Sequence, residues 1–111
     1  SNYKEFDALI EVLLSYTLNR LSKISLKGHA GYDIEGYDIY CAAVSSVWQG
    51  GLICLDDPNG YELKMKKGDS QLVIKGERSD HDKVVLEVIV RELKELSKNY
   101  PDYVRLKEET K

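Results

Sequence analysis

Two residues of reactive chemistry, His29 and Cys41, lie twelve positions apart in the segment GHAGYDIEGYDIYCAAVS, which spans residues 28–45. A cysteine thiolate is the nucleophile of cysteine hydrolases. A nearby imidazole can accept the thiol proton and later donate it to a leaving amine. The pair therefore suggests peptide or amide hydrolysis, provided that the fold brings the two side chains together.

The chain around Cys41 is typical of a helix start. Asp38 is a good N-cap residue, and an apolar helical run begins at Cys41. With Asp38 as the cap, Cys41 takes the third helical position, where unpaired backbone N–H groups and the helix dipole favour a thiolate and can bind an oxyanion. However, an early helical cysteine is usually a small buried residue and a loop histidine is usually a surface group, so the pair alone is a weak signal.

The elements that must position this pair follow from the apolar pattern. We expect an α+β domain of two layers in the order ββ-α-ββ-α-β, with a mixed or antiparallel sheet packed against two helices. A turn is expected at Asn19-Arg20, and Ser79 or Asp80 is expected to cap the second helix. The expected strands are 9–14, 23–27, 61–65, 71–75 and 103–107. The first helix is expected to begin at Asp38, and the second is expected to end at about Asn99.

Two features of the first predicted helix concern packing. Trp48 lies at helical spacing from Val44 and is expected in the core rather than in a substrate pocket. Gly50 and Gly51 each cost about 1 kcal/mol relative to alanine inside a helix. The helix is therefore expected to be short, to kink, or to pack closely against a neighbour at this point.

The motif GHAGYD, followed by G-x-D-I-x-C-A-A-V-S, resembles the signature of the ribosomal-processing cysteine proteases. The stretch LKELSKNYPDYVRL also resembles the C-terminal region of that family, so the resemblance covers residues 9–108. It implies that Cys41 is the nucleophile and His29 the general base and acid. Tyr40 departs from the small aliphatic residue that is usual before the cysteine, and Gly50-Gly51 is unexpected there.

The resemblance also implies a substrate and an assembly. The family removes an N-terminal extension from a large-subunit ribosomal protein of the L-twenty-seven family, forms homodimers and needs no cofactor. Gly28 and Gly36 would let the loop approach the peptide. Asp38 would cap the helix or orient His29, the cap being favoured, and Ser45 would hydrogen-bond near the thiol or to its own helix backbone.

Composition sets the remaining limits. The chain has 111 residues and a formal net charge of −3, which fits one domain and argues against a dedicated nucleic-acid binder. We expect residues 9–111 to form that domain and residues 1–8 to be a tag remnant or a disordered extension. No apolar run suits a membrane span and no signal peptide is visible, so we expect a cytoplasmic protein with reduced thiols.

Three alternatives stay open at this point. A non-catalytic module that binds a ribosomal protein or the ribosome would keep the groove without the chemistry. A metal site from His29, Cys41, Cys54 and His81 is disfavoured because the sequence has no close ligand pair such as C-x-x-C. A redox sensor based on Cys41 would show reversible oxidation without peptide cleavage.

Overall fold

The computed structural model describes residues 10–28, 38–66 and 68–111. The element order is ββ-α-ββ-α-β, as the sequence predicts, apart from one short 3₁₀ turn at Pro58–Gly60. The strands are β1 (Ile10–Thr17), β2 (Arg20–Gly28), β3 (Tyr61–Lys66), β4 (Asp69–Ile74) and β5 (Val104–Thr110), and the helices are α1 (Asp38–Leu52) and α2 (Asp80–Asn99).

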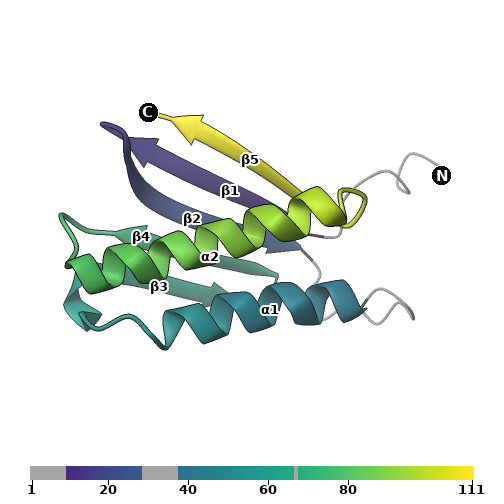
Figure 1. The fold of residues 1–111 in the computed structure, drawn as a ribbon, viewed down its shortest axis with the longest axis horizontal. Helices are drawn as coiled ribbons and strands as arrows, with labels where there is room; N and C mark the ends of the chain where they lie inside the picture. Colours follow the sequence, from purple (N-terminus) through teal and green to yellow (C-terminus); the bar gives the residue numbers. More distant parts are fainter. Residues whose placement is uncertain (1–9, 29–37, 67) are drawn as a thin grey trace.

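The five strands form one mixed sheet in the order β3-β4-β2-β1-β5. β5 pairs parallel with β1, with Ile10 opposite Val104, and the other neighbours are antiparallel. Both helices lie side by side on the same face of the sheet, which gives two layers (Figure 1). The predicted α+β class and two-layer arrangement are therefore confirmed.

The core lies between the sheet and the two helices. Alternate residues of β1 point toward the helices, because successive side chains of a strand face opposite sides. α2 buries residues at intervals of three and four, as an amphipathic helix must. The buried apolar residues are Ile10, Val12, Leu14, Ile24, Leu26, Cys41, Val44, Trp48, Leu72, Leu86, Ile89, Leu93 and Val104. The prediction that Trp48 packs in the core is thus confirmed.

The first hairpin is longer than its sequence pattern indicates, and its turn is shifted by one residue. β1 and β2 meet at Leu18 and Asn19, which have φ angles of 53° and 62°. Two left-handed residues form the tight turn that matches the twist of a hairpin. The prediction placed the turn at Asn19-Arg20, because Asn is a common turn residue and Leu18 is not.

The start of α2 follows the sequence closely. Ser79 is the N-cap, and its side-chain oxygen accepts a hydrogen bond from the backbone N–H of Asp82 at 3.1 Å. Asp80 and Asp82 lie in the first turn, where carboxylates interact favourably with the helix dipole. This cap fixes the position of Asp82, whose side chain points back into the domain.

Gly50 and Gly51 have different surroundings in α1. These surroundings decide whether the helix is short, kinks, or packs closely against a neighbour. α1 continues through both glycines to Leu52. A Cβ atom at Gly51 would overlap the side chain of Ile89 on α2, whereas a Cβ atom at Gly50 would meet open space. Gly51 is therefore the position that permits close packing of the two helices.

This difference predicts opposite effects of the same substitution. Gly51→Ala should lower the free energy of unfolding by about 1–2 kcal/mol, because Ile89 is buried and has little room to move. Gly50→Ala should raise it by about 0.5–1 kcal/mol through helix propensity alone. Urea unfolding followed by circular dichroism would measure both, and equal effects of the two substitutions would contradict this account of the packing.

Candidate active site

Cys41 lies in the first turn of α1, as its fourth residue. Its side chain is 6% exposed and belongs to the core cluster, together with Val44 and Trp48 on the same helical face. A helix start carries backbone N–H groups without intrahelical partners, so the surroundings of Cys41 can stabilise negative charge.

Cys41 also borders a cavity of about 270 Å³, so a ligand in this cavity would lie against the residue. One wall comes from α1 and the opposite wall from the end of β2 and the β3–β4 hairpin. The lining residues are Ile10, Leu26, Lys27, Gly28, Cys41, Val44, Ser45, Trp48, Gln49, Met65, Lys66, Gly68, Asp69 and Ser70. This composition combines an apolar lining with polar and charged residues, a mixture that is usual in ligand pockets.

The hairpin wall is held in place by two glycines. The backbone N–H of Gly28 donates to the carbonyl oxygen of Gly68 at 3.0 Å. Gly68 has a φ of 77°, and a Cβ atom there would approach the Gly28 carbonyl oxygen to 2.9 Å. Gly28 itself has a φ of 151°, which residues with a side chain rarely adopt. Glycine is therefore required where the hairpin meets the end of β2.

The residue before Cys41 ties the start of α1 to the rest of the domain. The ring of Tyr40 stacks on that of Tyr103, with centroids 4.2 Å apart and an interplanar angle of 11°. Tyr100 adds a tilted contact at 5.2 Å. Such ring pairs stabilise a fold beyond the area they bury. The large side chain at position 40 thus anchors the helix start that carries Cys41.

The other residues predicted for the site are placed as follows. Ser45 is half-buried and borders the same cavity as Cys41, one helical turn further on. α1 begins at Asp38, but the side chain of Asp38 lies outside the described part, so its capping role stays a prediction. His29 and Gly36 also lie outside the described residues.

The hairpin residues of the cavity could not be found from sequence alone. Gly68-Asp69 reads only as a turn, and its contact with Gly28 depends on the register of β2 with β4, in which Lys27 pairs with Asp69. The sequence shows only that Gly28 ends the segment of β2 and that Gly68 lies in the turn of the second hairpin. No local motif indicates that these two glycines are in contact.

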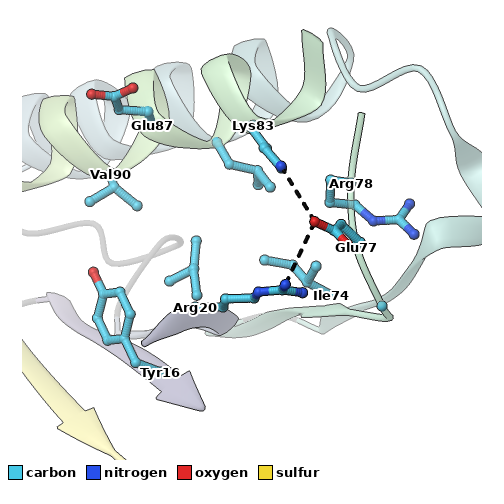
Figure 2. Close-up of a pocket in the computed structure, with 11 residues that line it drawn as sticks. Tyr16, Arg20, Ile74, Glu77, Arg78, Lys83, Glu87 and Val90 are labelled. Carbon is cyan, nitrogen blue, oxygen red and sulfur yellow. Dashed lines mark ion pairs between the residues drawn. The ribbon is translucent and has the colours of Figure 1, made fainter. Parts of the chain in front are cut away.

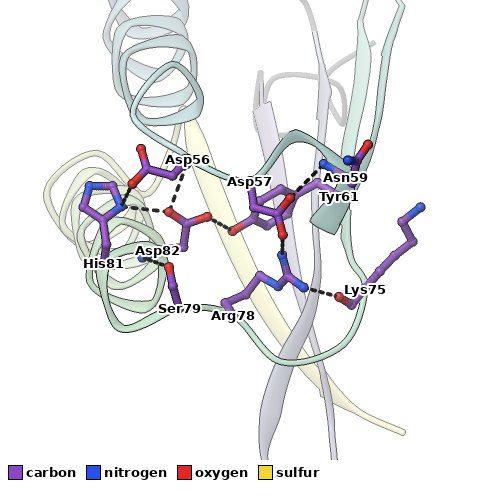
Figure 3. Close-up of polar contacts among 9 residues, drawn as sticks. All are labelled: Asp56, Asp57, Asn59, Tyr61, Lys75, Arg78, Ser79, His81 and Asp82. Carbon is purple, nitrogen blue, oxygen red and sulfur yellow. Dashed lines mark hydrogen bonds and ion pairs between the residues drawn. The ribbon is translucent and has the colours of Figure 1, made fainter.

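A separate polar cluster joins the loop after α1 to the start of α2, and Figure 3 shows its contacts. The Asp82 side chain is 0% exposed and accepts hydrogen bonds from the Tyr61 hydroxyl at 2.7 Å and from the Asp56 backbone N–H at 3.0 Å. His81 Nδ1 lies 2.8 Å from Asp82 Oδ1 and 3.1 Å from Asp56 Oδ2. The cluster therefore shields a buried charge with several partners.

These contacts set the ionisation of the cluster. Burial raises the pKa of Asp82, but hydrogen bonds from Tyr61, the Asp56 backbone and His81 outweigh burial and lower that pKa from 3.8 to about 2. The hydrogen bond to Asp82 raises the pKa of His81 above 6.5, opposed by burial and assisted by the charge of Asp56. Burial and Asp82 raise the pKa of Tyr61.

Asp56, His81 and Asp82 also form a group whose ligand atoms lie within 4.8 Å of one another, which is close enough to hold a metal ion. Both oxygens of Asp82 already accept hydrogen bonds from protein groups, so the arrangement is explained as a structural network. In the described residues His81 lies with Asp56 and Asp82 and is not grouped with Cys41 or Cys54, and His29 lies outside the described part, so the disfavoured metal site of His29, Cys41, Cys54 and His81 gains no support.

A second and larger cavity, of about 440 Å³, lies at the other end of the sheet. Its lining includes Tyr16 and Leu21 beside the β1–β2 turn, whereas Cys41 is near the opposite ends of these strands. In Figure 2, the Glu77 carboxylate lies between Arg20 and Lys83, at 3.6 Å from a nitrogen of each. Such exposed ion pairs contribute little to stability.

Residues 9–105 match the model of the protein family described as cysteine protease Prp. The ribosomal processing cysteine protease Prp of Mycoplasma genitalium is 31% identical over 85 residues, which cover 76% of this chain and 85% of the relative. The described helices include none that is long and apolar enough to cross a membrane.

Solved structures share the fold at lower identity. The protein SMU.848 from Streptococcus mutans has a TM-score of 0.74 and 21% identity, with 94% of this chain and 97% of that chain covered. The ribosomal processing protease Prp from S. aureus, in complex with a covalently linked product peptide, has a TM-score of 0.73 and 19% identity, with 89% and 98% covered. The family match and the Mycoplasma relative together show that this chain belongs to the ribosomal processing cysteine protease family and is a cysteine protease.

Proposed function

We propose that this chain is the endopeptidase that removes the N-terminal extension of a large-subunit ribosomal protein of the L-twenty-seven family, with Cys41 as nucleophile. The observation that carries the proposal is the position of Cys41, in the first turn of α1 and on the border of a cavity that can receive a peptide. Membership of a family of ribosomal processing proteases supports the choice of substrate.

The remaining roles are assigned from the sequence motif. His29 would act as the general base and acid. Asp38 would cap α1, and Ser45 would hydrogen-bond near the thiol. Gly28 and Gly36 would let the backbone bend and come close to the peptide. The backbone geometry of Gly28 supports its part of this assignment, because its φ of 151° suits glycine.

The reaction would proceed in two stages. In the first, the Cys41 thiolate attacks the scissile carbonyl carbon, the peptide C–N bond breaks, and His29 gives its proton to the leaving amine of the mature ribosomal protein. The extension stays on Cys41 as a thioester. In the second, His29 takes a proton from water as the water oxygen attacks the thioester carbonyl, the C–S bond breaks, and the extension leaves with a free carboxyl group. Cys41 is left as a thiolate beside protonated His29, which is the pair that begins the next cycle. Backbone N–H groups at the start of α1 would stabilise the oxyanion at both stages.

The proposed substrate and the family resemblance suggest the compartment in which the protein acts and its state of assembly. We expect the protein to act in the bacterial cytoplasm, where the precursor is made, and to form a homodimer. The net charge of −3 suits a basic ribosomal partner. No direct contact with nucleic acid is part of the proposal.

Incubation of the purified protein with the unprocessed ribosomal protein from the same organism tests the proposal. The mass of the ribosomal protein should fall by that of a short N-terminal peptide, and the mature form should resist further cleavage. His29→Ala should leave the precursor uncut. Binding of the precursor by the wild type without any cleavage would favour the non-catalytic binding module instead.

A further inference from the structure

β3 is an edge strand whose outer side is open. In the sheet order, β4 lies on one side of β3 and no described strand lies on the other. In Figure 1, β3 runs along the edge of the sheet nearest to α1. Its last residues, Met65 and Lys66, line the cavity that Cys41 also borders. This edge of the sheet therefore leads into the candidate active site.

The register of β3 with β4 shows which backbone groups of β3 face outward. The Lys75 N–H donates to the carbonyl oxygen of Gly60 at 2.9 Å, so these two residues form a hydrogen-bonded pair. Hydrogen-bonded and non-hydrogen-bonded pairs alternate along an antiparallel ladder, and the register continues without a shift through β3. Tyr61, Leu63 and Met65 therefore direct their backbone N–H and carbonyl groups away from β4.

Leu63 and Met65 also direct apolar side chains toward the helical layer. Leu63 lies opposite Leu72, which is 1% exposed and belongs to the core, and directly opposite residues face the same side of a sheet. Met65 is two residues further along and shares that side. Leu63 and Met65 are nevertheless 46% and 51% exposed. We call these two side chains the apolar stripe of β3.

An extended peptide is the ligand that such an edge accepts. A peptide that adds as a strand pairs with the outward backbone groups, and its alternate side chains contact one face of the sheet. Edge strands usually carry charged residues that discourage such pairing. In β3 the charged residues Glu62, Lys64 and Lys66 alternate with the apolar stripe and so lie on the face away from the helices. The side toward the cavity is left open to a partner.

Charge favours the extension over the mature ribosomal protein as the added strand. Mature ribosomal proteins bind RNA phosphates through Lys and Arg side chains. The cavity lining has two lysines, Lys27 and Lys66, against one acidic residue, Asp69, and Lys64 is close by in β3. A basic segment would be repelled here. The extension is absent from the mature protein and needs no basic charge.

We propose that the extension of the precursor binds as an added strand on the outer edge of β3, with backbone hydrogen bonds to Leu63 and Met65 and apolar side chains against the apolar stripe. The inference rests on the proposed function, because it takes Cys41 as the nucleophile and the extension as the substrate. Met65 lines the cavity of Cys41, so it contacts the side chain nearer the scissile bond. Leu63 contacts the side chain two residues further away.

An ester scan of the peptide tests the backbone pairing and leaves β3 unchanged. Each peptide spans the junction between the extension and the mature protein and has one amide of the extension replaced by an ester, which removes a single N–H donor. Binding is measured by calorimetry on Cys41→Ser. Affinity should fall by about three- to tenfold at every second ester and by less than about twofold at the esters between them. Equal losses at successive positions would overturn the added strand.

Variants of the apolar stripe test the side-chain contacts. Leu63→Gln and Met65→Gln should each raise KM by about five- to tenfold and leave kcat within about twofold, because the lost contact is made equally in the ground and transition states. Val88→Gln is the control for lost apolar surface, since Val88 is 47% exposed but borders the groove between α1 and α2. Lys64→Gln is the control for the face of β3. Both controls should keep KM within about twofold of the wild type.

Alanine substitutions in the peptide assign each contact to its residue. Alanine in place of the extension residue that contacts Leu63 should weaken binding to the wild type and have little further effect on Leu63→Gln, because the two changes remove one interaction. The same peptide should still lose affinity for Met65→Gln. Equal effects of the alanine peptide on the wild type and on Leu63→Gln would contradict the assignment.

A second copy of this chain is the other ligand that an open strand edge can accept. Sedimentation of the wild type and of Leu63→Gln distinguishes the two. The proposal predicts the same mass in solution for both proteins. A lower mass for Leu63→Gln, with an unchanged KM and no period-two pattern in the ester scan, would assign the edge to self-association and overturn the proposal.

The outcomes separate this inference from the proposed function. Cleavage by the wild type, with no period-two pattern and an unchanged KM in Leu63→Gln and Met65→Gln, would overturn this inference alone. The period-two pattern without cleavage by the wild type would support the added strand and contradict the proposed cleavage. A wild type that neither binds nor cleaves the peptide would contradict both. Cleavage, the period-two pattern and a raised KM in the two variants would support both.

Discussion

Replacement of Cys41 by serine is expected to lower kcat/KM for the precursor peptide by about a thousandfold or more, the scale on which proteases lose activity without their nucleophile. A serine hydroxyl at the same place is a far weaker nucleophile than a thiolate. The substitution puts a hydroxyl into a side-chain position that is 6% exposed, at a cost in stability of about 1–2 kcal/mol. The variant should therefore fold and still bind the peptide.

The chain contains its own matched control for this experiment. Cys54 is exposed in the turn that follows α1, and it borders a different groove, between α1 and α2. Cys54→Ser should cleave the peptide at the wild-type rate. Equal loss of activity in both variants, or full activity in Cys41→Ser with a normal circular dichroism spectrum, would show that Cys41 is not the nucleophile.

Removal of the buried carboxylate at Asp82 is expected to have the largest effect on stability among the substitutions considered. Asp82→Ala leaves the Tyr61 hydroxyl and the Asp56 backbone N–H without their acceptor. The free energy of unfolding should fall by about 2–4 kcal/mol. In a domain of this size each kcal/mol corresponds to roughly 4–8 °C in the melting temperature.

Asp80 provides the control, because it lies in the same helical turn, carries the same charge and is exposed. Asp80→Ala removes a favourable interaction with the helix dipole, at a cost of about 0.3–1 kcal/mol. Urea unfolding would measure both variants. Similar losses at the two positions would show that the network around Asp82 contributes nothing beyond its charge at the helix start.

The pKa shifts of Asp82 and His81 predict how the free energy of unfolding depends on pH. The pKa of Asp82 is lowered from 3.8 to about 2, so its contribution is present above pH 3.8 and is lost as the pH falls toward 2. The pKa of His81 is raised, so its contribution is full below pH 6.5 and is lost as the pH rises through the folded value. The stability difference between the wild type and Asp82→Ala should therefore be largest between pH 3.8 and 6.5.

The fold could be predicted from the sequence where the signals are local. The order of the elements follows from apolar spacing, and the Ser79 cap and the end of α2 before Pro101 follow from residue chemistry. The strand order does not, because pairing of β1 with β5 joins residues about ninety positions apart. Strand ends and the turn at Leu18 were placed less well, since three-dimensional pairing extends strands beyond their period-two signal.

In the candidate site, too, the features with local sequence signals could be predicted and those that depend on long-range pairing could not. The motif around Cys41 identifies one wall of the cavity and one half of the proposed catalytic pair. The opposite wall, around Gly68, depends on the register of β2 with β4, which no local sequence pattern indicates. Apolar spacing along α1 predicts that Trp48 is buried, which it is.

The central claim is that Cys41 is the residue that meets the scissile carbonyl of the ribosomal extension. A peptide of the extension that ends in a chloromethyl ketone tests it most directly, since a thiolate placed at the reacting carbon displaces chloride and forms a thioether. Simple alkylation favours the exposed thiol, Cys54, over the buried Cys41. Recognition of the peptide should reverse that preference.

Fragmentation of the labelled protein would locate the adduct. We expect one adduct per chain, on Cys41, that forms more slowly when excess precursor competes and that abolishes cleavage in proportion to labelling. An adduct on Cys54 alone, or full protease activity after complete labelling of Cys41, would contradict it.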